Sequence, residues 1–144
     1  LDLNWLLQIR SEIETIPYSD LGISKAFGKP FSEYTKTMPQ HVKASKWANN
    51  KLGTEITNKD NPYLFYIKSN CEEDLKKNDR QKAICLNEGD LKFIDGRPDI
   101  FSIDYDVYFK KQIYEQLEEF ALIPEVQNML DAYKGYVKRV SQPA

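Results

Sequence analysis

The chain has 144 residues, a formal net charge of −2 and 41% hydrophobic residues, which is typical of one globular domain that buries a core without metal or disulfide support. No run of about 18 apolar residues is present, which excludes a membrane-spanning helix, and no secretory signal precedes the first predicted helix. We therefore expect a cytoplasmic protein that is not secreted and has no membrane partner. Because the first residue is Leu1 and not Met, we expect a processed chain or a piece of a longer one.

The N-terminal third alternates between two periodicities. Residues 1–17 are predicted to form a helix, because apolar side chains and one arginine recur on one face until Pro17 ends it. Within 19–27, apolar residues and Lys25 fall on alternate positions, which predicts a short strand. The members of that alternating row are Leu21, Ile23, Lys25 and Phe27.

A second helix is predicted after Thr37, with Thr37 as its N-cap and Pro39 in the first turn. Gly53 should end this helix in the left-handed conformation that favours glycine. Trp47 is expected to lie in the core or half in it. The side chains predicted to face inward are Val42, Ala48 and Leu52.

The middle of the chain contains two predicted strands around a polar segment. Residues 61–69 are aromatic and apolar and follow an Asn-Pro turn signal, and 83–86 read as a returning strand. The segment 70–82 is rich in both charges and is predicted to be an exposed loop, while 87–99 are predicted to be irregular.

Two helices complete the pattern, interrupted at Pro124. The first opens at Asp104, with Phe109, Ile113, Leu117 and Phe120 on one stripe. The second places five apolar side chains on one side, namely Val126, Met129, Leu130, Tyr133 and Val137. The fold class predicted for the whole chain is α+β, a helix-dominated single domain over 1–144 with a small antiparallel sheet.

The sequence carries none of the common signatures of catalysis or metal binding. The sequence has no glycine-rich phosphate loop and no GxSxG turn. Asp90-Leu-Lys92 and Pro98-Asp99 occur in the reverse of the order that a restriction-type nuclease site requires. Asp104 and Asp106 at a helix start are better explained by the helix dipole than by a metal, and the two cysteines, Cys71 and Cys85, are predicted to be reduced and not to bind zinc.

Positive charge is concentrated in one segment. Residues 25–51 hold six lysines and one glutamate, a net charge of +5, whereas the rest of the chain has 14 basic and 21 acidic residues, a net charge of −7. Such asymmetry is typical of a surface for a polyanion. On charge alone, a solvated lysine surface remains an alternative.

The predicted helix start adds a geometric argument for phosphate binding. Backbone N–H groups at a helix N-terminus, with Thr37 and Lys36 beside them, form a ready anion site. Lys43 and Lys46 are three residues apart and share a face one turn further on. His41 lies in the first turn, where its ring could contact a phosphate or simply pack. Such contacts would position a duplex without reading its bases.

Residues 19–56, "SDLGISKAFGKPFSEYTKTMPQHVKASKWANNKLGTEI", resemble the start of the thumb domain of family B DNA polymerases, which has a "DLVI-K-L-K" strand followed by "PHV-VA". Gln40 is inserted between the proline and the histidine of that motif. The matching residues are Leu21, Ile23, Lys25, Pro30, Tyr34, Pro39, His41, Val42 and Ala44.

Two later segments are similar to the same family in the same order. "NKDNPYLFYIKS" resembles its "GD-IPYVI" strand, and "SIDYDVYFKKQIYEQLEEFAL" resembles its "DY-YYL-NQI--PLERI" helix. The matching residues are Pro62, Tyr63, Ile67, Asp104, Tyr105, Tyr108, Phe109, Gln112, Ile113, Leu117 and Glu118.

The resemblance implies a thumb region that grips primer–template duplex during DNA replication, with residues 1–17 leading in from a palm domain. The "DxxSLYP" and "YGDTDS" palm motifs are missing, so no catalytic residue, metal site or cofactor is expected in this chain, and Mg would belong to the palm of the parent polymerase. The palm and exonuclease domains would be partners, at a nucleoid or a viral replication site. No clamp-binding box is present in the tail. The residues expected to contact DNA are Lys29, Tyr34, Lys36, Thr37, His41, Lys43 and Lys46.

Two alternatives from other functional classes stay open. The chain could be a stand-alone protein-interaction adaptor whose basic face meets an acidic partner, or an independent enzyme. The adaptor predicts tight binding to a protein and little to DNA, and palm motifs upstream of Leu1 would decide for the polymerase.

Overall fold

The computed structural model describes residues 1–142 and divides the chain into two compact units. One, the sheet unit, is formed by Pro17–Asp104, and the other, the helical unit, by Leu1–Ile16 with Tyr105–Ala144. The α+β class, with many helices and a small antiparallel sheet, is confirmed. That 1–144 act as one thumb-like domain stays a prediction.

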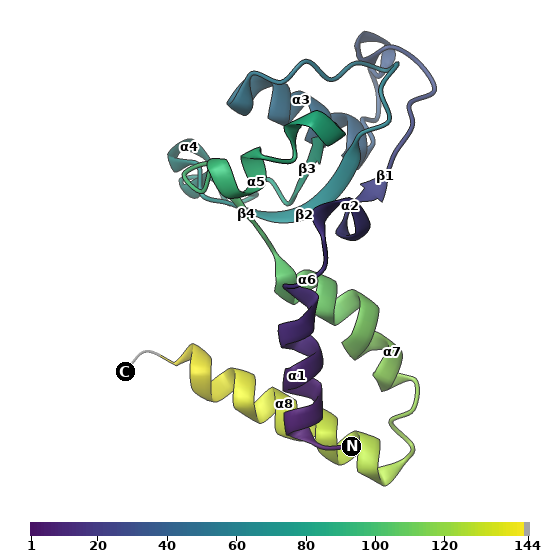
Figure 1. The fold of residues 1–144 in the computed structure, drawn as a ribbon, viewed down its shortest axis with the longest axis vertical. Coiled ribbons are helices and arrows are strands. Elements are labelled where there is room, and N and C mark those ends of the chain that lie inside the picture. The colour runs from purple at the N-terminus through teal and green to yellow at the C-terminus, as the bar shows by residue number, and fades with distance from the viewer. Residues whose placement is uncertain (143–144) are drawn as a thin grey trace. The chain divides into compact units, whose positions relative to one another are not determined.

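The sheet unit is built around β2 (Tyr63–Ser69), which forms antiparallel pairs with all the other strands of the sheet (Figure 1). Its first half pairs with β1 (Ile23–Ser24) and β3 (Ala83–Leu86), and its second half pairs with β4 (Phe101–Ile103). All four residues of β3 are buried, as expected for a continuous apolar run covered on both faces.

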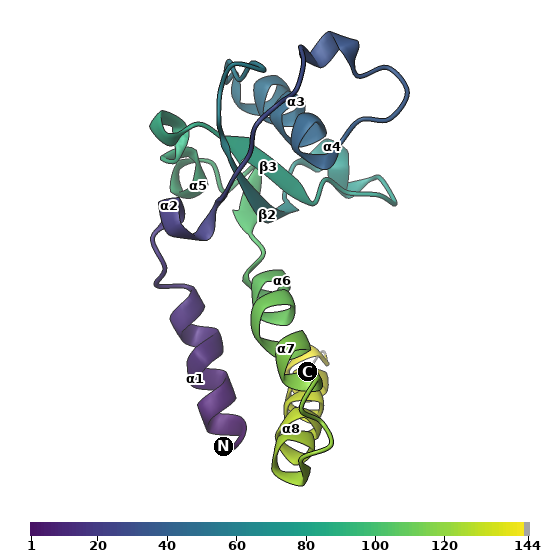
Figure 2. The same cartoon turned by 90° about the vertical axis from the view of Figure 1, so that its right-hand side faces the viewer.

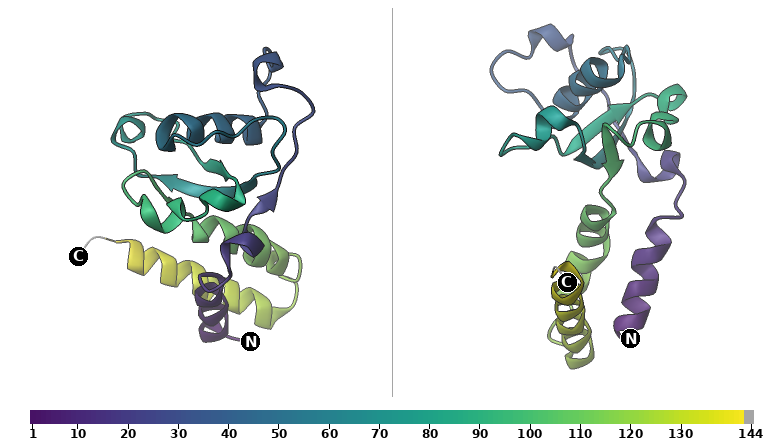
Figure 3. Two further views of the ribbon diagram at one scale, coloured as in Figure 1. Left: turned by 45° about the horizontal axis from the view of Figure 1, so that its top comes forward. Right: turned by 90° about the vertical axis from the view of Figure 1, so that its left-hand side faces the viewer.

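Helix α3 (Gln40–Leu52) packs along β3 and ends at Gly53, whose φ of 72° is left-handed (Figures 1 and 3). Its stop signal is therefore confirmed. Val42 and Ala48 are fully buried as predicted, whereas Leu52 is half-buried. Trp47 is half-buried, within the predicted range.

Several short elements complete the sheet unit, and most were not predicted. The segment 70–82 is largely exposed, as expected, but it contains a helical turn, and Asp74 in it is 3% exposed and accepts a hydrogen bond from Ser69 at 2.9 Å. The short helices are α2 (Tyr18–Leu21), η1 (Phe31–Glu33), α4 (Glu72–Leu75), η2 (Glu88–Asp90) and α5 (Phe93–Gly96).

The strand predicted within 19–27 is wrong except at Ile23–Ser24. Residues 18–21 form helix α2, and the extended backbone begins only at Gly22. A Cβ atom at Gly22 would lie 2.7 Å from the Cβ of Tyr63 and 2.8 Å from Cζ of Phe65. The chain can cross β2 this closely because residue 22 has no side chain.

The helical unit contains α1 (Leu3–Ile13), which Asp2 caps by accepting a hydrogen bond from the Trp5 amide at 3.0 Å. A second, continuous helix runs through α6 (Tyr105–Phe109), the π-helical turn η3 (Lys110–Tyr114) and α7 (Glu115–Glu118). Pro124 opens α8 (Pro124–Ser141), as its fixed φ favours the first helical position. Figure 2 shows α1 beside the continuous helix of α6 and α7.

The apolar stripe predicted for the second helix is wrong beyond Phe109. Ile113 and Leu117 are only half-buried and Phe120 is 56% exposed, whereas Tyr114 is buried. The π turn explains the shift, because one extra residue in a helical turn rotates every later side chain relative to the core. In α8, Val126, Met129 and Leu130 are buried as predicted, while Tyr133 is half-buried and Val137 is 38% exposed.

Within residues 1–142, no helix has both the length and the apolar character that a bilayer crossing requires.

Candidate nucleic-acid interface

The first turn of α3 is held against the sheet by its own backbone. The carbonyl oxygen of His41 accepts hydrogen bonds from Oγ of Ser45 at 2.8 Å and from Sγ of Cys85 at 3.4 Å. Ser45 and Cys85 are both fully buried. The Ser45 bond lies within α3, whereas the Cys85 bond attaches the helix start to β3.

The prediction that Thr37 caps α3 is wrong. The helix begins at Gln40, Pro39 occupies the N-cap position with φ −58° and ψ 154°, and no side chain caps it. A proline disfavours the helical conformation at the residue before it, here Met38, so the helix cannot extend back toward Thr37. Thr37 is exposed in the preceding loop, and its role in DNA contact stays a prediction.

Four predicted DNA-contacting lysines form the basic surface of this unit. All four are exposed, and none forms an ion pair with another residue in the described part of the chain. Lys43 and Lys46 lie on α3, whereas the other two lie in the loop 25–39 that leads to its first turn and stands away from the sheet (Figure 2). The set is Lys29, Lys36, Lys43 and Lys46.

The two remaining lysines of the basic segment are half-buried. The Lys51 ammonium donates to the carboxylate of Glu73. This hydrogen bond raises the pKa of Lys51 and lowers the pKa of Glu73. Lys25 is half-buried, and its charge acts on the buried Cys85 thiol. The positive surface is therefore smaller than the sequence count suggested.

Tyr34 and Lys29 support the shape of the loop. The Lys29 ammonium lies 4.7 Å from the centroid of the Tyr34 ring, within cation–π range. The Tyr34 hydroxyl accepts a hydrogen bond from the Gly28 amide at 3.3 Å. Tyr34 thus closes the loop from 28 to 34, and a phosphate contact by its hydroxyl stays a prediction.

His41 packs against an aromatic side chain that the sequence analysis did not assign to the site. Its ring is stacked on Phe27 with a centroid distance of 5.0 Å and an interplanar angle of 19°. Phe27 also meets Phe31 edge-on at 4.8 Å. This cluster joins the loop to the start of α3, so His41 has a packing role whether or not it contacts DNA.

Variants of His41 should separate these two roles. We expect His41→Phe, which keeps a ring on Phe27, to melt within about 2 °C of the parent, and His41→Ala to melt several degrees lower. A ring that donates a hydrogen bond to a phosphate is lost in both variants, so both should bind duplex several-fold more weakly than the parent. Thermal melting and fluorescence anisotropy check this. If His41→Phe binds duplex as tightly as the parent, His41 is only a packing residue.

Burial also controls the chemistry of Cys85. It raises the pKa of the thiol to about 11, against the smaller opposing effects of the Ser45 hydrogen bond and the Lys25 charge. Cys71 is buried and free as well. A neutral, enclosed thiol is a poor nucleophile, so Cys85 acts as a packing residue under α3.

The Cys85 pKa predicts a fall in stability at high pH. The unfolded chain loses this proton near its ordinary value, about 8.5 to 9, before the folded chain does at about 11. Between these values the folded state binds more protons, so the free energy of unfolding decreases as pH rises, by about 1.4 kcal/mol per pH unit. Urea titrations from pH 8 to 11 should measure the free energy of unfolding of the parent and of Cys85→Ala. The parent value minus the variant value should decrease as pH rises. A difference that does not change with pH would contradict this prediction.

Asp106, in the first turn of α6, has a structural partner. Asp106 accepts a hydrogen bond from Nε of Arg10 at 3.0 Å. Among the residues that the structure describes, no group of three or more His, Cys, Asp or Glu is arranged to hold a metal ion.

In comparisons with known proteins, no family model, no curated protein and no solved structure matches this chain. The case for the interface therefore depends on its own geometry and charge.

Proposed function

We propose that this chain is the thumb region of a family B DNA polymerase and that its sheet unit grips the phosphate backbones of primer–template duplex. The observation that carries the proposal is the set of four exposed lysines, two on α3 and two in the loop that leads to it, without ion-pair partners in residues 1–142. Their concentration in a chain of net charge −2 favours a polyanionic partner.

The chemistry of this surface suits contact without sequence readout. Lysines, a threonine and helix amides bind phosphate oxygens and carry no base information. The proposed contact set contains no asparagine or glutamine, which form paired hydrogen bonds with adenine, and no arginine, whose planar fork does so with guanine. A polymerase thumb has to slide along its product after each nucleotide addition, and sequence-independent contacts permit that movement.

Duplex binding by the 144-residue chain tests the proposal. We expect weak binding to 20-bp duplexes, equal for sequences of different composition, with a slope of log affinity against log salt of about −3 to −4 if all four lysines contact phosphates. Fluorescence anisotropy between about 20 and 200 mM salt measures the slope. No duplex binding together with tight binding to an acidic protein would favour the adaptor.

Catalysis provides a second test. Since the palm motifs are absent from the sequence, the purified chain should not extend a primer in the presence of Mg²⁺ or Mn²⁺. A primer-extension gel checks this, with an intact family B polymerase as the positive control. Template-dependent incorporation by the 144-residue protein would overturn the thumb assignment.

A further inference from the structure

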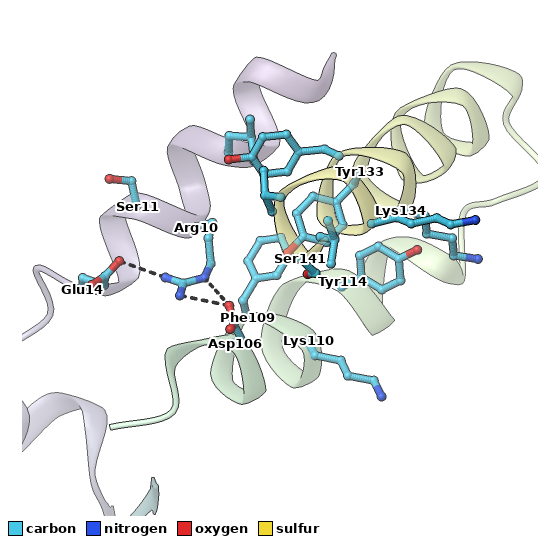
Figure 4. A pocket seen from close by; sticks show the side chains of 15 residues that line it. Arg10, Ser11, Glu14, Asp106, Phe109, Lys110, Tyr114, Tyr133, Lys134 and Ser141 are labelled. Atoms are coloured by element: carbon cyan, nitrogen blue, oxygen red, sulfur yellow. Dashed lines mark hydrogen bonds and ion pairs between the residues drawn. The ribbon is translucent and has the colours of Figure 1, made fainter. Parts of the chain in front are cut away.

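A groove of about 790 Å³ lies within the helical unit, where α1, the second helix and the C-terminal half of α8 meet (Figure 4). None of the residues of the proposed duplex interface lines it. A groove of this size accommodates side chains from a peptide or a small ligand, so it is a candidate for a binding function separate from DNA contact.

Aromatic and aliphatic side chains form its walls. Tyr133 lies against Phe109 with a centroid distance of 5.1 Å and against Tyr114 at 5.6 Å. On the α8 side, Val137 and Val140 line the groove while remaining 38% and 62% exposed. Exposed apolar side chains beside an ordered aromatic wall mark a surface on which a partner can bury apolar area.

The charges that line the groove are predominantly positive. Its two carboxylates are already engaged by one arginine, since Arg10 donates to Asp106 at 3.0 Å and to Glu14 at 3.1 Å. Three lysines remain on the rim, and none has an ion-pair partner within residues 1–142. These are Lys110, Lys134 and Lys138. An occupant with negative charge on both flanks would complement this rim.

One buried polar atom in the groove also lacks a partner. Tyr114 is 9% exposed, and its hydroxyl makes no hydrogen bond with any residue that the structure describes. Its pKa is raised by burial, against the nearby charge of Lys134, whose side chain lies next to the phenol in Figure 4. A ligand whose polar group reaches this hydroxyl would give it a hydrogen-bond partner.

We propose that this groove binds an acidic amphipathic helix of a partner protein. The lining residues of α8 extend from 133 to 141, about 12 Å or two helical turns, which suits the helix-in-groove mode of recognition. Apolar side chains of the bound helix pack on the exposed Val137 and Val140. Its flanking carboxylates meet the three lysines.

Single-stranded nucleic acid is the main rival occupant, because lysines and tyrosines are the side chains that bind it. Base stacking needs free ring faces, however, and Tyr114 and Tyr133 are packed against each other and against Phe109. The groove therefore favours a peptide.

A phage-displayed library of 18-residue helical peptides tests the proposal on the full 144-residue protein. Positions on one face are varied among Ala, Leu, Phe, Tyr and Trp, and flanking positions among Glu, Gln and Lys. We expect selection to enrich Glu on the flanks. A selected peptide should bind Lys138→Glu at least about fivefold more weakly than the parent, while Arg139→Glu, which reverses the neighbouring charge outside the groove, changes affinity by less than about twofold.

Further variants test whether the apolar wall of the groove, and not the duplex interface, binds the peptide. Val137→Asp should also weaken the peptide, and all variants should melt within about 2 °C of the parent. Lys43→Ala with Lys46→Ala should leave peptide affinity unchanged, so that failure of duplex binding does not affect this proposal. Three outcomes would overturn the proposal. Selection could enrich Lys on the flanks, or no selected peptide could discriminate Lys138→Glu from Arg139→Glu. A dT20 oligonucleotide could also compete with the peptide in a manner that depends on Lys138.

Discussion

Replacing Lys36, Lys43 and Lys46 together by alanine is expected to weaken duplex binding at least about 100-fold at ~50 mM salt. Each lysine that contacts a phosphate releases counterions, and its removal should reduce the salt slope by about 0.9. All three side chains are exposed, and none forms an ion pair with a residue in the described part of the chain. Their loss should therefore leave the free energy of unfolding nearly unchanged. Anisotropy titrations at several salt concentrations, with urea unfolding as a check, measure both quantities.

A charge-matched variant tests whether location or net charge matters. Lys110, Lys134 and Lys138 line the groove of the helical unit, and replacing all three by alanine changes the net charge equally. We expect this control to keep the parent salt slope within about half a unit. Because the affinity of the first triple variant can become too weak to measure, the three single variants should be titrated as well. Equal slopes in parent and triple variant would mean that these lysines are only a solvated face.

The strands could be predicted where burial is extreme. The runs at 63–69 and 83–86 are apolar and lie in the interior of the sheet unit, so composition alone identifies them. The three-residue strand β4 and the four-residue helices α2 and α4 are too short to show a repeating pattern of apolar residues. Their conformation is decided by pairing and packing with distant residues.

The lysines of the interface could be predicted from charge, but their partners could not. Lys51 contributes to the positive charge of the basic segment, but its ammonium donates a hydrogen bond to Glu73, which is 22 residues away in the sequence. The stacking of Phe27 on His41 joins residues 14 positions apart. The sequence offers one sign of this cluster, namely two phenylalanines, Phe27 and Phe31, before the basic helix. The alternating pattern around Phe27 predicts a strand instead.

The groove of the helical unit could not be found from the sequence because a change of helical phase creates part of it. With a regular helix, Ile113 would face the core. The π turn at Lys110–Tyr114 buries Tyr114 instead, where it meets Tyr133 from α8. Periodicity arguments assume a constant number of residues per turn, so they fail where one extra residue enters the helix.

Asn49→Ala is expected to lower the free energy of unfolding by about 3 kcal/mol, because two backbone groups and one hydroxyl lose their partner. The Asn49 amide nitrogen donates to the carbonyl of Ile56 at 2.9 Å. Its Oδ1 accepts from the Ile56 amide at 2.9 Å and from Oγ1 of Thr54 at 2.8 Å. Ile56 is 2% exposed and Thr54 9%, so water cannot replace these bonds without local opening.

Neighbouring variants isolate this network from helix propensity. Asn50 lies in the same turn of α3 but is exposed, so Asn50→Ala should change stability by less than about 0.5 kcal/mol. Asn49→Asp keeps the acceptor and loses the donor, and it should lie between the parent and Asn49→Ala. Urea unfolding at pH 7 ranks the four proteins. The segment after Gly53 connects α3 to β2. A large loss of unfolding free energy in the Asn49 variants alone would show that this side chain fixes the helix carrying Lys43 and Lys46 to that segment. Equal effects of Asn49→Ala and Asn50→Ala would contradict this role.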